Sequence, residues 1–406
     1  MCVGGHVQMI ACPILKVLHV CTVPSTARAF VAPLASYLET RGYEVTIACS
    51  EDPNQEIGVT MEEMRAAGFR MKEIPIPRLI QPIGDLRATL ELYRFIRKER
   101  FAIVHTQTTK AGFVGRLAAS LARAPVIIHS AYAFPFHPYL PAMRRKVYAW
   151  MERVAAKWAD LVMVPTDAVR LDGLYHQVAP PEKILTVPMG INLQRFSRQR
   201  TNPAAIREEW GVPFDAPVVG SVARLVPDKG LECFLDAAAR VAALNERVRF
   251  LIVGDGPLRR ALEQQAQRLG IADRVIFAGM RSDIPEQMAA MDLFVLPTLR
   301  EGFGVVLAES MAMGVPVVAS DIPALLEVVA NGETGILLPP GDPERFAVAI
   351  LDLLRDETRR LAMGAAGRRR VELLFDERQI FARIEATYTR LLRLKGHQSG
   401  TEVTRC

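Results

Sequence analysis

The sequence predicts an α/β protein with two doubly wound, Rossmann-like parallel-sheet domains in tandem. Short β-branched segments alternate with longer amphipathic segments, which is the β-α-β rhythm of a parallel sheet covered by helices. This rhythm is interrupted once, near the middle of the chain, and then resumes. The length of 406 residues also fits two domains of ordinary size.

The first half of the chain begins with two strands separated by a helix. Ile14–Cys21 and Glu44–Cys49 are rich in Val and Ile, and the helix expected over Phe30–Arg41 is ended by Gly42. The later elements expected in this half are a helix at Leu86–Lys98, a strand at Ala102–Val104, a helix at Lys110–Ala122, and strands at Pro125–His129 and Asp160–Val164.

The interruption is Gln194–Pro217, a polar segment rich in Arg and Pro, which is typical of an interdomain linker. After it we expect strands at Val218–Val222, Arg249–Val253, Val275–Ala278, Leu293–Leu296, Val315–Ala319 and Gly335–Leu338, with helices at Gly230–Leu244 and Leu258–Leu269. The expected division is a first domain at 1–195, a second at 196–375, a crossover helix at 376–395 and a disordered tail at 396–406.

Composition excludes several classes of protein. No run of about 20 apolar residues could span a bilayer, and Met1–Pro13 lacks the pattern of a signal peptide. Six scattered cysteines without a CxxC pair argue against a disulfide framework or a zinc site and favour a reducing cytoplasm. Residues 1–200 carry 25 Lys and Arg against 16 Asp and Glu. This basic half suits a phosphorylated substrate or anionic lipid, or is simply solvated, and no nucleic-acid-binding motif accompanies it.

The most informative segment is LREGFGVVLAESMAMGVPVVASD at 299–321. Glu301 precedes Gly302, Phe303 and Gly304, and a helix is expected to follow, with Glu309 in its second turn. Backbone amides at such a glycine-flanked helix start can bind phosphate. The carboxylate in the second turn can accept hydrogen bonds from two ribose hydroxyls, and the carboxylate in the loop from sugar hydroxyls.

A second segment, GSVARLVPDKG at 220–230, places two cations in a loop between a strand and a helix. Arg224 and Lys229 are five residues apart and can straddle a diphosphate. Each alone is as readily explained by a solvated loop. Together with the acidic segment about 70 residues later, they predict a site for a nucleotide.

These two segments, with VGDGP at Val253–Pro257, resemble family-4 retaining glycosyltransferases, which have the GT-B fold of two domains facing across a cleft. In the first half, 104–119 and 127–137 resemble the bacterial capsule and exopolysaccharide branch. The resemblance implies that the second domain binds a nucleoside-diphosphate sugar, with UDP favoured, and that the first binds a polyprenyl-linked or other surface-polysaccharide acceptor.

The resemblance also implies residue roles on the donor side. Arg224 and Lys229 match the cations that hold the donor diphosphate, Glu301 matches the acid that touches the donor sugar, and Glu309 matches the ribose-binding acid. Gly302, Phe303 and Gly304 present amides nearby. These cations and amides would stabilise the negative charge on the departing diphosphate. The sequence has no Asp-x-Asp motif in a suitable loop, which argues against an essential metal.

The acceptor side departs from the family pattern. Tyr132-Ala133-Phe134 stands where relatives often have His-Gly-Phe, and a tyrosine does not titrate near neutral pH as histidine does. Tyr132 remains a candidate for binding a sugar hydroxyl. His129 is a candidate substitute for the missing histidine, as is His105, although a histidine in a strand is more often structural.

Two other functions remain open from the sequence, a GT-B sugar-nucleotide epimerase and a non-catalytic nucleotide-sugar binder. A separate question concerns 135–158, where Val147, Trp150, Met151, Val154 and Trp158 recur at helical spacing after the basic run Arg144, Arg145 and Lys146. This helix either packs on the first domain's core or seats the protein on an anionic membrane surface.

Overall fold

The computed structural model describes residues 14–51, 59–77, 80–137 and 139–396. Within them the chain forms two compact units. Unit 1 comprises residues up to Val164, Asp172–Leu185 and the residues from Phe381 onward, and unit 2 comprises Pro165–Leu171 and Thr186–Ile380. The residues of the tail expected to be disordered, apart from Gly396, lie outside the described ranges.

Unit 1 is built on a seven-stranded sheet in the order β3-β2-β1-β4-β5-β6-β7. Its strands are β1 (Lys16–Val20), β2 (Glu44–Cys49), β3 (Arg70–Glu73), β4 (Ile103–Gln107), β5 (Val126–Ser130), β6 (Leu161–Val164) and β7 (Ile184–Thr186). Its helices are α2 (Ala32–Thr40), α3 (Met61–Ala66), α4 (Pro82–Glu99), α5 (Thr109–Leu121) and α6 (Ala142–Lys157), after the short α1 (Pro24–Thr26) and the π-helix η1 (Ala27–Val31). Helix α7 (Asp167–Tyr175) begins in unit 2 and ends in unit 1.

Unit 2 is built on a six-stranded sheet in the order β10-β9-β8-β11-β12-β13. Its strands are β8 (Val218–Val222), β9 (Arg249–Val253), β10 (Val275–Gly279), β11 (Leu293–Leu296), β12 (Val317–Ser320) and β13 (Gly335–Leu338). Its helices are α8 (Pro203–Glu209), α9 (Leu231–Leu244), α10 (Arg259–Arg268), α11 (Ile284–Ala289), α12 (Val305–Ala312), α13 (Pro323–Val328), α14 (Pro343–Arg355) and α15 (Glu357–Leu374).

The recorded strand pairs in both sheets are parallel, which confirms the predicted α/β class. Chain order reverses between β1 and β4 in unit 1 and between β8 and β11 in unit 2. In an open parallel sheet, ligands bind beyond the carboxyl ends of the strands at such a reversal. The loops that follow these four strands are therefore where binding residues are expected.

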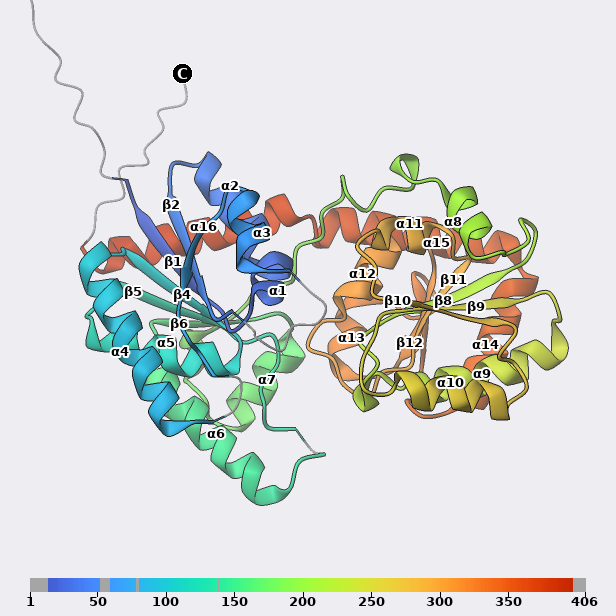
Figure 1. Ribbon diagram of the computed structural model, residues 1–406, viewed down its shortest axis with the longest axis horizontal. Coiled ribbons are helices and arrows are strands. Elements are labelled where there is room, and N and C mark those ends of the chain that lie inside the picture. Colours follow the sequence, from blue (N-terminus) through green and yellow to red (C-terminus); the bar gives the residue numbers. More distant parts are fainter. Residues whose placement is uncertain (1–13, 52–58, 78–79, 138, 397–406) are drawn as a thin grey trace, which may run out of the picture. The chain divides into compact units, whose positions relative to one another are not determined.

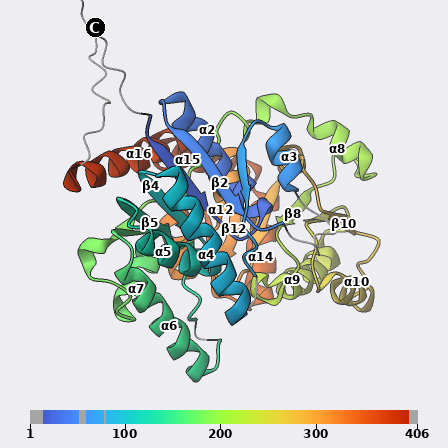
Figure 2. The same ribbon diagram turned by 60° about the vertical axis from the view of Figure 1, so that its left-hand side comes forward.

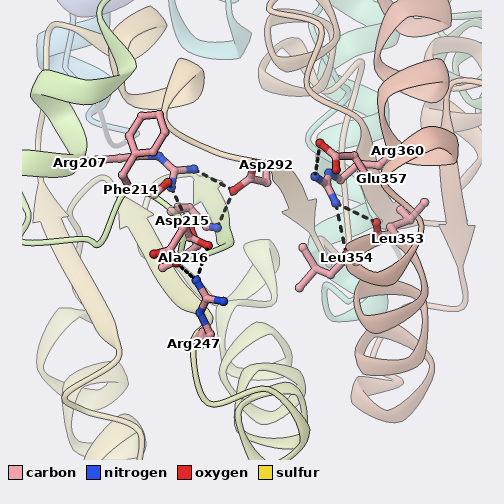
Figure 3. Close-up of polar contacts among 11 residues, drawn as sticks. Arg207, Phe214, Asp215, Ala216, Arg247, Asp292, Leu353, Leu354, Glu357 and Arg360 are labelled. Carbon is pink, nitrogen blue, oxygen red and sulfur yellow. Dashed lines mark hydrogen bonds and ion pairs between the residues drawn. The ribbon is translucent and has the colours of Figure 1, made fainter.

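The segment expected to be a linker belongs to unit 2. Gln194–Pro217 contains α8, which starts with Asn202 accepting a hydrogen bond from the Ala205 amide. Arg207 ties this helix to the sheet by donating to the Phe214 and Ala216 carbonyls and to Asp292 (Figure 3). The Asp292 carboxylate also accepts a hydrogen bond from the Val218 amide, and this bond holds the first residue of β8 in place.

The last helix, α16 (Glu377–Leu394), starts in unit 2 and continues in unit 1. In unit 1 it is held by polar contacts, because Glu385 accepts hydrogen bonds from the Tyr37 hydroxyl and from Arg41. Tyr388 is completely buried there and reaches the sheet interior. Unit 1 is therefore completed by residues at the far end of the chain.

The apolar side chains that recur along α6 differ in their exposure to solvent. Val147 and Trp150 are 45% and 61% exposed, whereas Met151, Val154 and Trp158 are half-buried. Trp158 packs edge-on against Phe113 of α5. The stripe is therefore divided, with one part packed against unit 1 and the other part open to solvent.

Candidate functional site

The two predicted donor segments meet at the reversal point of the unit 2 sheet. Lys229 lies in the loop after β8 and Glu301 in the loop after β11, and the Lys229 Nζ is 2.6 Å from the Glu301 Oε1. Both side chains are shielded, at 17% and 13% exposure. The structure therefore brings together a cation and an acid that are 72 residues apart in the sequence.

Backbone contacts fix the two loops against each other. The Asp228 carbonyl accepts hydrogen bonds from the Thr298 hydroxyl and from the Leu299 amide, both at 2.8 Å. Gly230 adopts a left-handed conformation with φ of 65°, and a Cβ there would lie 2.0 Å from the Pro297 carbonyl oxygen. Only glycine permits so close an approach, so these contacts preorganise the Lys229–Glu301 region.

The glycine segment after Glu301 prepares the start of α12. Gly304 is left-handed, with φ of 79°, and no side chain caps the helix. The first amides of α12 are therefore left for a ligand or solvent. Phe303 is buried edge-on against Phe375, and the Gly302 carbonyl accepts from the Thr166 hydroxyl. The Phe303 ring thus anchors the loop.

Glu309 lies in the second turn of α12. Burial raises its pKa to about 7, and the positive charge of Arg195 acts in the opposite direction. Arg195 is held near the start of α11 by a hydrogen bond to the Ser282 carbonyl. Glu309 has no ion-pair partner among the described residues. Hydrogen bonds from the hydroxyl groups of a ligand would therefore stabilise its ionised carboxylate.

Arg224 is an exposed residue in the loop after β8. The loop itself is held by backbone bonds, with the Leu225 amide donating to the Asp255 carbonyl and the Leu258 amide to the Leu225 carbonyl. The VGDGP turn therefore supports the cation loop. Arg224 and Lys229 share the segment between β8 and α9, and an exposed guanidinium there can bind a diphosphate through two parallel hydrogen bonds.

The candidate acceptor residues in unit 1 form a buried polar group near the β1–β4 reversal. Tyr132 is half-buried, packs against Phe30 with the two rings tilted by 37°, and donates a hydrogen bond of 2.7 Å to the Gln107 side-chain oxygen. Burial raises the Tyr132 pKa, so it remains a neutral hydroxyl. Gln107 also contacts His19 Nδ1 at 3.4 Å, and burial lowers the His19 pKa to about 3.

His105 links this group to the last helix. Its Nδ1 is 2.6 Å from the Tyr388 hydroxyl and its Nε2 is 2.8 Å from the Ser130 hydroxyl. Burial and the neighbouring His19 hold the pKa of His105 well below its usual range. His105 is therefore a neutral residue that fastens α16 to the sheet.

His129 lies on the opposite side of the same sheet. It is 1% exposed, its Nδ1 is 3.0 Å from the Thr106 hydroxyl, and its ring is so close to Gly112 of α5 that a Cβ there would lie 2.3 Å away. Burial and the nearby Arg116 lower its pKa. These contacts place His129 between sheet and helix, apart from Tyr132 and Gln107.

Several participating residues had no signal in the sequence. His19, Ser130 and Tyr388 are ordinary residues of a strand, a strand end and a helix, and only the fold brings them to Gln107 and His105. In the described part of the chain, no group of three or more His, Cys, Asp or Glu side chains is placed to hold a metal ion. No helix found there has the length and hydropathy to cross a membrane.

Comparison with known proteins assigns each half to a glycosyltransferase domain. Residues 25–190 match the family described as "Glycosyl transferase 4-like domain", and residues 203–370 match "Glycosyl transferases group 1". A UDP-Gal:alpha-D-GlcNAc-diphosphoundecaprenol alpha-1,3-galactosyltransferase of Escherichia coli is 28% identical over 84% of this chain and 89% of its own. An alpha-D-kanosaminyltransferase of Streptomyces kanamyceticus is 30% identical over 73% and 81%.

Further comparisons agree with these. The capsular polysaccharide biosynthesis glycosyltransferase CapM of Staphylococcus aureus is 28% identical over 79% of this chain and 85% of its own. The structure of Anabaena HepE, solved with UDP and glucose, superposes with a TM-score of 0.80 at 23% identity, over 92% of this chain and 99% of that one. The chain therefore belongs to the family-4 glycosyltransferases of the GT-B fold, in the capsule and exopolysaccharide branch.

Proposed function

We propose that this glycosyltransferase moves a sugar from a UDP-sugar to a polyprenyl-linked or other surface-polysaccharide acceptor, with retention of the anomeric configuration. The observation that carries the proposal is the Lys229–Glu301 pair, held at 2.6 Å beside the uncapped start of α12. A binding site for a UDP-sugar needs a cation near the diphosphate and an acidic side chain near the sugar. This pair offers both at the reversal point of the unit 2 sheet.

Each donor residue has a distinct role in the proposal. Arg224 and Lys229 bind the diphosphate, Glu301 accepts hydrogen bonds from the transferred sugar, and Glu309 accepts them from the ribose. The backbone amides of Gly302, Phe303 and Gly304 are proposed to donate to the diphosphate, and the bend that ends at the left-handed Gly304 supports this role.

The chemistry follows from where charge develops. As the acceptor hydroxyl approaches the anomeric carbon from the side of the leaving group, the bond to the diphosphate breaks and negative charge grows on UDP. The new bond forms from the acceptor oxygen, and the departing diphosphate oxygen takes the hydroxyl proton. Lys229, Arg224 and the α12 amides oppose that charge without moving far, because their loops are already fixed by the Asp228 and Gly230 contacts. Removing one preorganised donor of this kind costs about 10²–10³ in rate. In this proposal the cations neutralise the leaving group and no metal is essential.

The acceptor is proposed to bind to unit 1 near Tyr132. The Tyr132 hydroxyl is already oriented by Gln107, and its oxygen retains capacity to accept a bond from a sugar hydroxyl. The Escherichia coli relative is named for a diphosphoundecaprenol-linked acceptor, and CapM for capsular polysaccharide. These names support a lipid-linked saccharide as the acceptor class. The contacts of His129 favour a structural rather than a catalytic role for it.

The test is transfer from radiolabelled UDP-sugars to undecaprenyl-diphosphate-linked saccharides, with UDP binding followed by calorimetry. We expect Arg224→Ala and Lys229→Ala each to weaken UDP binding and lower transfer about 100-fold. The thermal unfolding midpoint should stay unchanged in Arg224→Ala, whose side chain is exposed, and fall in Lys229→Ala, which leaves the shielded Glu301 carboxylate without its cation. Arg260→Ala, on the exposed side of α10, is a matched control. UDP affinity equal to that of the unmodified chain in both variants would exclude the assigned diphosphate site.

We also propose that the protein works in the cytoplasm and attaches peripherally to the inner face of the membrane. Met143, Val147 and Trp150 of α6 are 73%, 45% and 61% exposed and recur at helical spacing. Arg144 and Lys146 beside them are exposed too. Arg144, Arg145 and Lys146 are consecutive in the sequence, so the first turns of α6 carry a local positive charge.

A second exposed apolar stripe supports the same surface. Ile83, Leu86 and Leu90 of α4 are 87%, 61% and 43% exposed, at spacings of three and four residues. The N-terminal ends of α4 and α6 lie at the same end of unit 1 in both views (Figures 1 and 2). Apolar side chains can enter the lipid interface while the neighbouring cations contact anionic headgroups.

Vesicle co-sedimentation tests this attachment. A basic residue near an anionic surface contributes about 1 kcal/mol, so replacing Arg144, Arg145 and Lys146 with Ser should lower partitioning about 100-fold. The attraction should also fade at 1 M salt, where the screening length falls to about 3 Å. Calorimetry with UDP should be unchanged by the triple substitution. Equal sedimentation of both proteins at low salt would remove this cluster as the membrane contact.

The two alternative functions receive no support from the relatives described above, which are named as transferases. An epimerase would act on the UDP-sugar with no acceptor present. A non-catalytic binder would retain UDP binding and show no transfer with any acceptor. The transfer assay with and without lipid-linked saccharide separates all three.

A further inference from the structure

We propose that unit 1 carries a second anion site, for a phosphate-bearing ligand, at the amino-terminal edge of its sheet. A hollow of about 850 Å³ opens there, between the start of β1 and β5 and the ends of α4 and α5. Tyr132 and Gln107 lie at the opposite, carboxyl edge of the sheet. The site is therefore separate from the acceptor residues, and the inference does not rest on the proposed transfer.

Three arginines line the hollow. Arg97 belongs to the last turn of α4, Arg100 follows that helix, and Arg123 follows α5. Within the described ranges, none of them has a carboxylate partner, and no Asp or Glu lines the hollow with them. Lys16, the fourth cation on the wall, differs because Glu99 and Glu44 lie 3.2 Å and 3.8 Å from its Nζ. The wall thus concentrates unpaired positive charge.

Backbone conformation sets two of these arginines apart. Arg100 has φ of 56° and Arg123 has φ of 57°, both in the left-handed region that usually holds glycine after a helix. Holding a residue with a Cβ in this conformation is unfavourable, and such residues concentrate at functional sites. In unit 1, arginine rather than glycine adopts this left-handed conformation at the ends of both α4 and α5, which line one hollow.

The helix dipole explains only part of this arrangement. A cation near the C-terminal end of a helix is favourable in water, so one arginine at each end needs no ligand. A dipole does not require the two arginines to share a hollow, and it does not supply the apolar wall. Ile14, which is 68% exposed, and the half-buried Leu15 belong to that wall. Paired cations over an apolar wall suit a ligand that has both an anionic and an apolar part.

The chemistry points to phosphate as the anionic part. The planar guanidinium group binds phosphate oxygens through two parallel hydrogen bonds, and three such groups can neutralise a doubly charged anion. A hollow of this volume lies in the range that holds a small-molecule ligand of nucleotide size. The phosphate can come from a soluble phosphate ester or from the headgroup of an anionic lipid.

The first experiment uses inorganic diphosphate as the probe in calorimetry. The donor site is first disabled by Arg224→Ala with Lys229→Ala, so that remaining binding reports the second site. We expect residual binding that weakens with salt. Adding Arg100→Gly and Arg123→Gly should lower the affinity at least tenfold. Glycine is favoured at both positions, so the fold should be retained or stabilised.

Two controls make the outcome specific. Gln177→Gly relieves the same left-handed conformation elsewhere in unit 1, at φ of 52°, without removing charge. Arg94→Gln with Lys98→Gln removes two exposed charges from α4 that do not line the hollow. Neither control should change the affinity. Diphosphate binding that is absent once the donor site is disabled, or that survives the two glycine substitutions unchanged, would overturn the proposal.

A second arm distinguishes the two sources of phosphate. Phosphatidylglycerol vesicles are sedimented with the unmodified chain and with the Arg100→Gly, Arg123→Gly variant. A lipid headgroup ligand predicts at least tenfold weaker vesicle binding by the variant, whereas a soluble phosphate ester predicts equal vesicle binding with weaker diphosphate binding. Both results retain the site and identify its ligand.

Discussion

Replacing Glu301 with glutamine should separate donor binding from transfer. In the structure the Lys229 ammonium is held by the Glu301 carboxylate at 2.6 Å, so a diphosphate must compete with that carboxylate for the cation. Glu301→Gln keeps the shape of the side chain and removes its charge. We expect UDP to bind more tightly to the variant and the sugar to be transferred more slowly.

The size of the effect follows from the burial of the pair. The two side chains are 17% and 13% exposed, so the pair lies between exposed pairs, worth up to about 1 kcal/mol, and fully buried ones, whose disruption costs about 3–5 kcal/mol. Taking about 1–2 kcal/mol for the competition gives UDP affinity about 5–30-fold higher. Loss of the carboxylate that contacts the sugar should lower the transfer rate about 100-fold or more.

Calorimetry with UDP and a transfer assay with UDP-sugar measure the two effects on the same preparation. Glu263→Gln is a matched control, because that residue pairs with Arg259 on the surface of α10. It should change neither quantity. Weaker UDP binding in Glu301→Gln, or a transfer rate equal to that of the unmodified chain, would refute the assigned competition.

The other predictions concern three single residues, Glu309, Tyr388 and Gly304. Because the pKa of Glu309 is about 7 without ligand, UDP affinity should fall as the pH drops from about 8 to 6, and Glu309→Gln should abolish this dependence in calorimetry. Between about pH 4.5 and 7 the folded chain retains a Glu309 proton that the unfolded chain releases, so this group's contribution to stability falls as the pH rises through that window in denaturant titrations. Tyr388→Phe leaves His105 Nδ1 without its partner and should lower the free energy of unfolding by about 1–3 kcal/mol while UDP binding persists. Gly304→Ala places a Cβ 2.6 Å from Leu325 Cδ2 at a φ of 79°, and should lower stability by more than about 1 kcal/mol, seen in thermal unfolding, and weaken UDP binding.

The sequence predicted elements where apolar residues form short runs. Strands β8, β9, β11 and β13 have the predicted bounds, because each is a buried apolar segment between polar loops. The edge strand β3 (Arg70–Glu73) escaped prediction because its RMKE sequence is mostly exposed and has no alternation. Helix α8 was read as linker because its proline and charged residues resemble a loop.

The same contrast holds for the candidate site. Arg224, Lys229, Glu301 and Glu309 could be singled out because the glycines that shape their loops stand beside them in the sequence. The pairing of Lys229 with Glu301 was implied only by the fold. The contact of His105 with Tyr388 joins residues 283 positions apart and depends on where α16 returns to the sheet, for which no local pattern exists.

Because α16 returns to unit 1, this unit can be completed only after α16 has been synthesised. Most of unit 1 is synthesised before unit 2, yet its sheet interior is closed by Tyr388 and its α2 helix is held by Glu385. At about 5–20 residues per second, roughly 10–40 s separate Leu185 from Leu394. During that interval the polar side chains around His105 lack the cover of α16 in the nascent unit 1. Residues 186–380 of unit 2 do not need that part of the helix in order to fold. A chain shortened before Phe381 should therefore yield an incomplete first unit, and successful separation of the halves would need the last helix joined to the first.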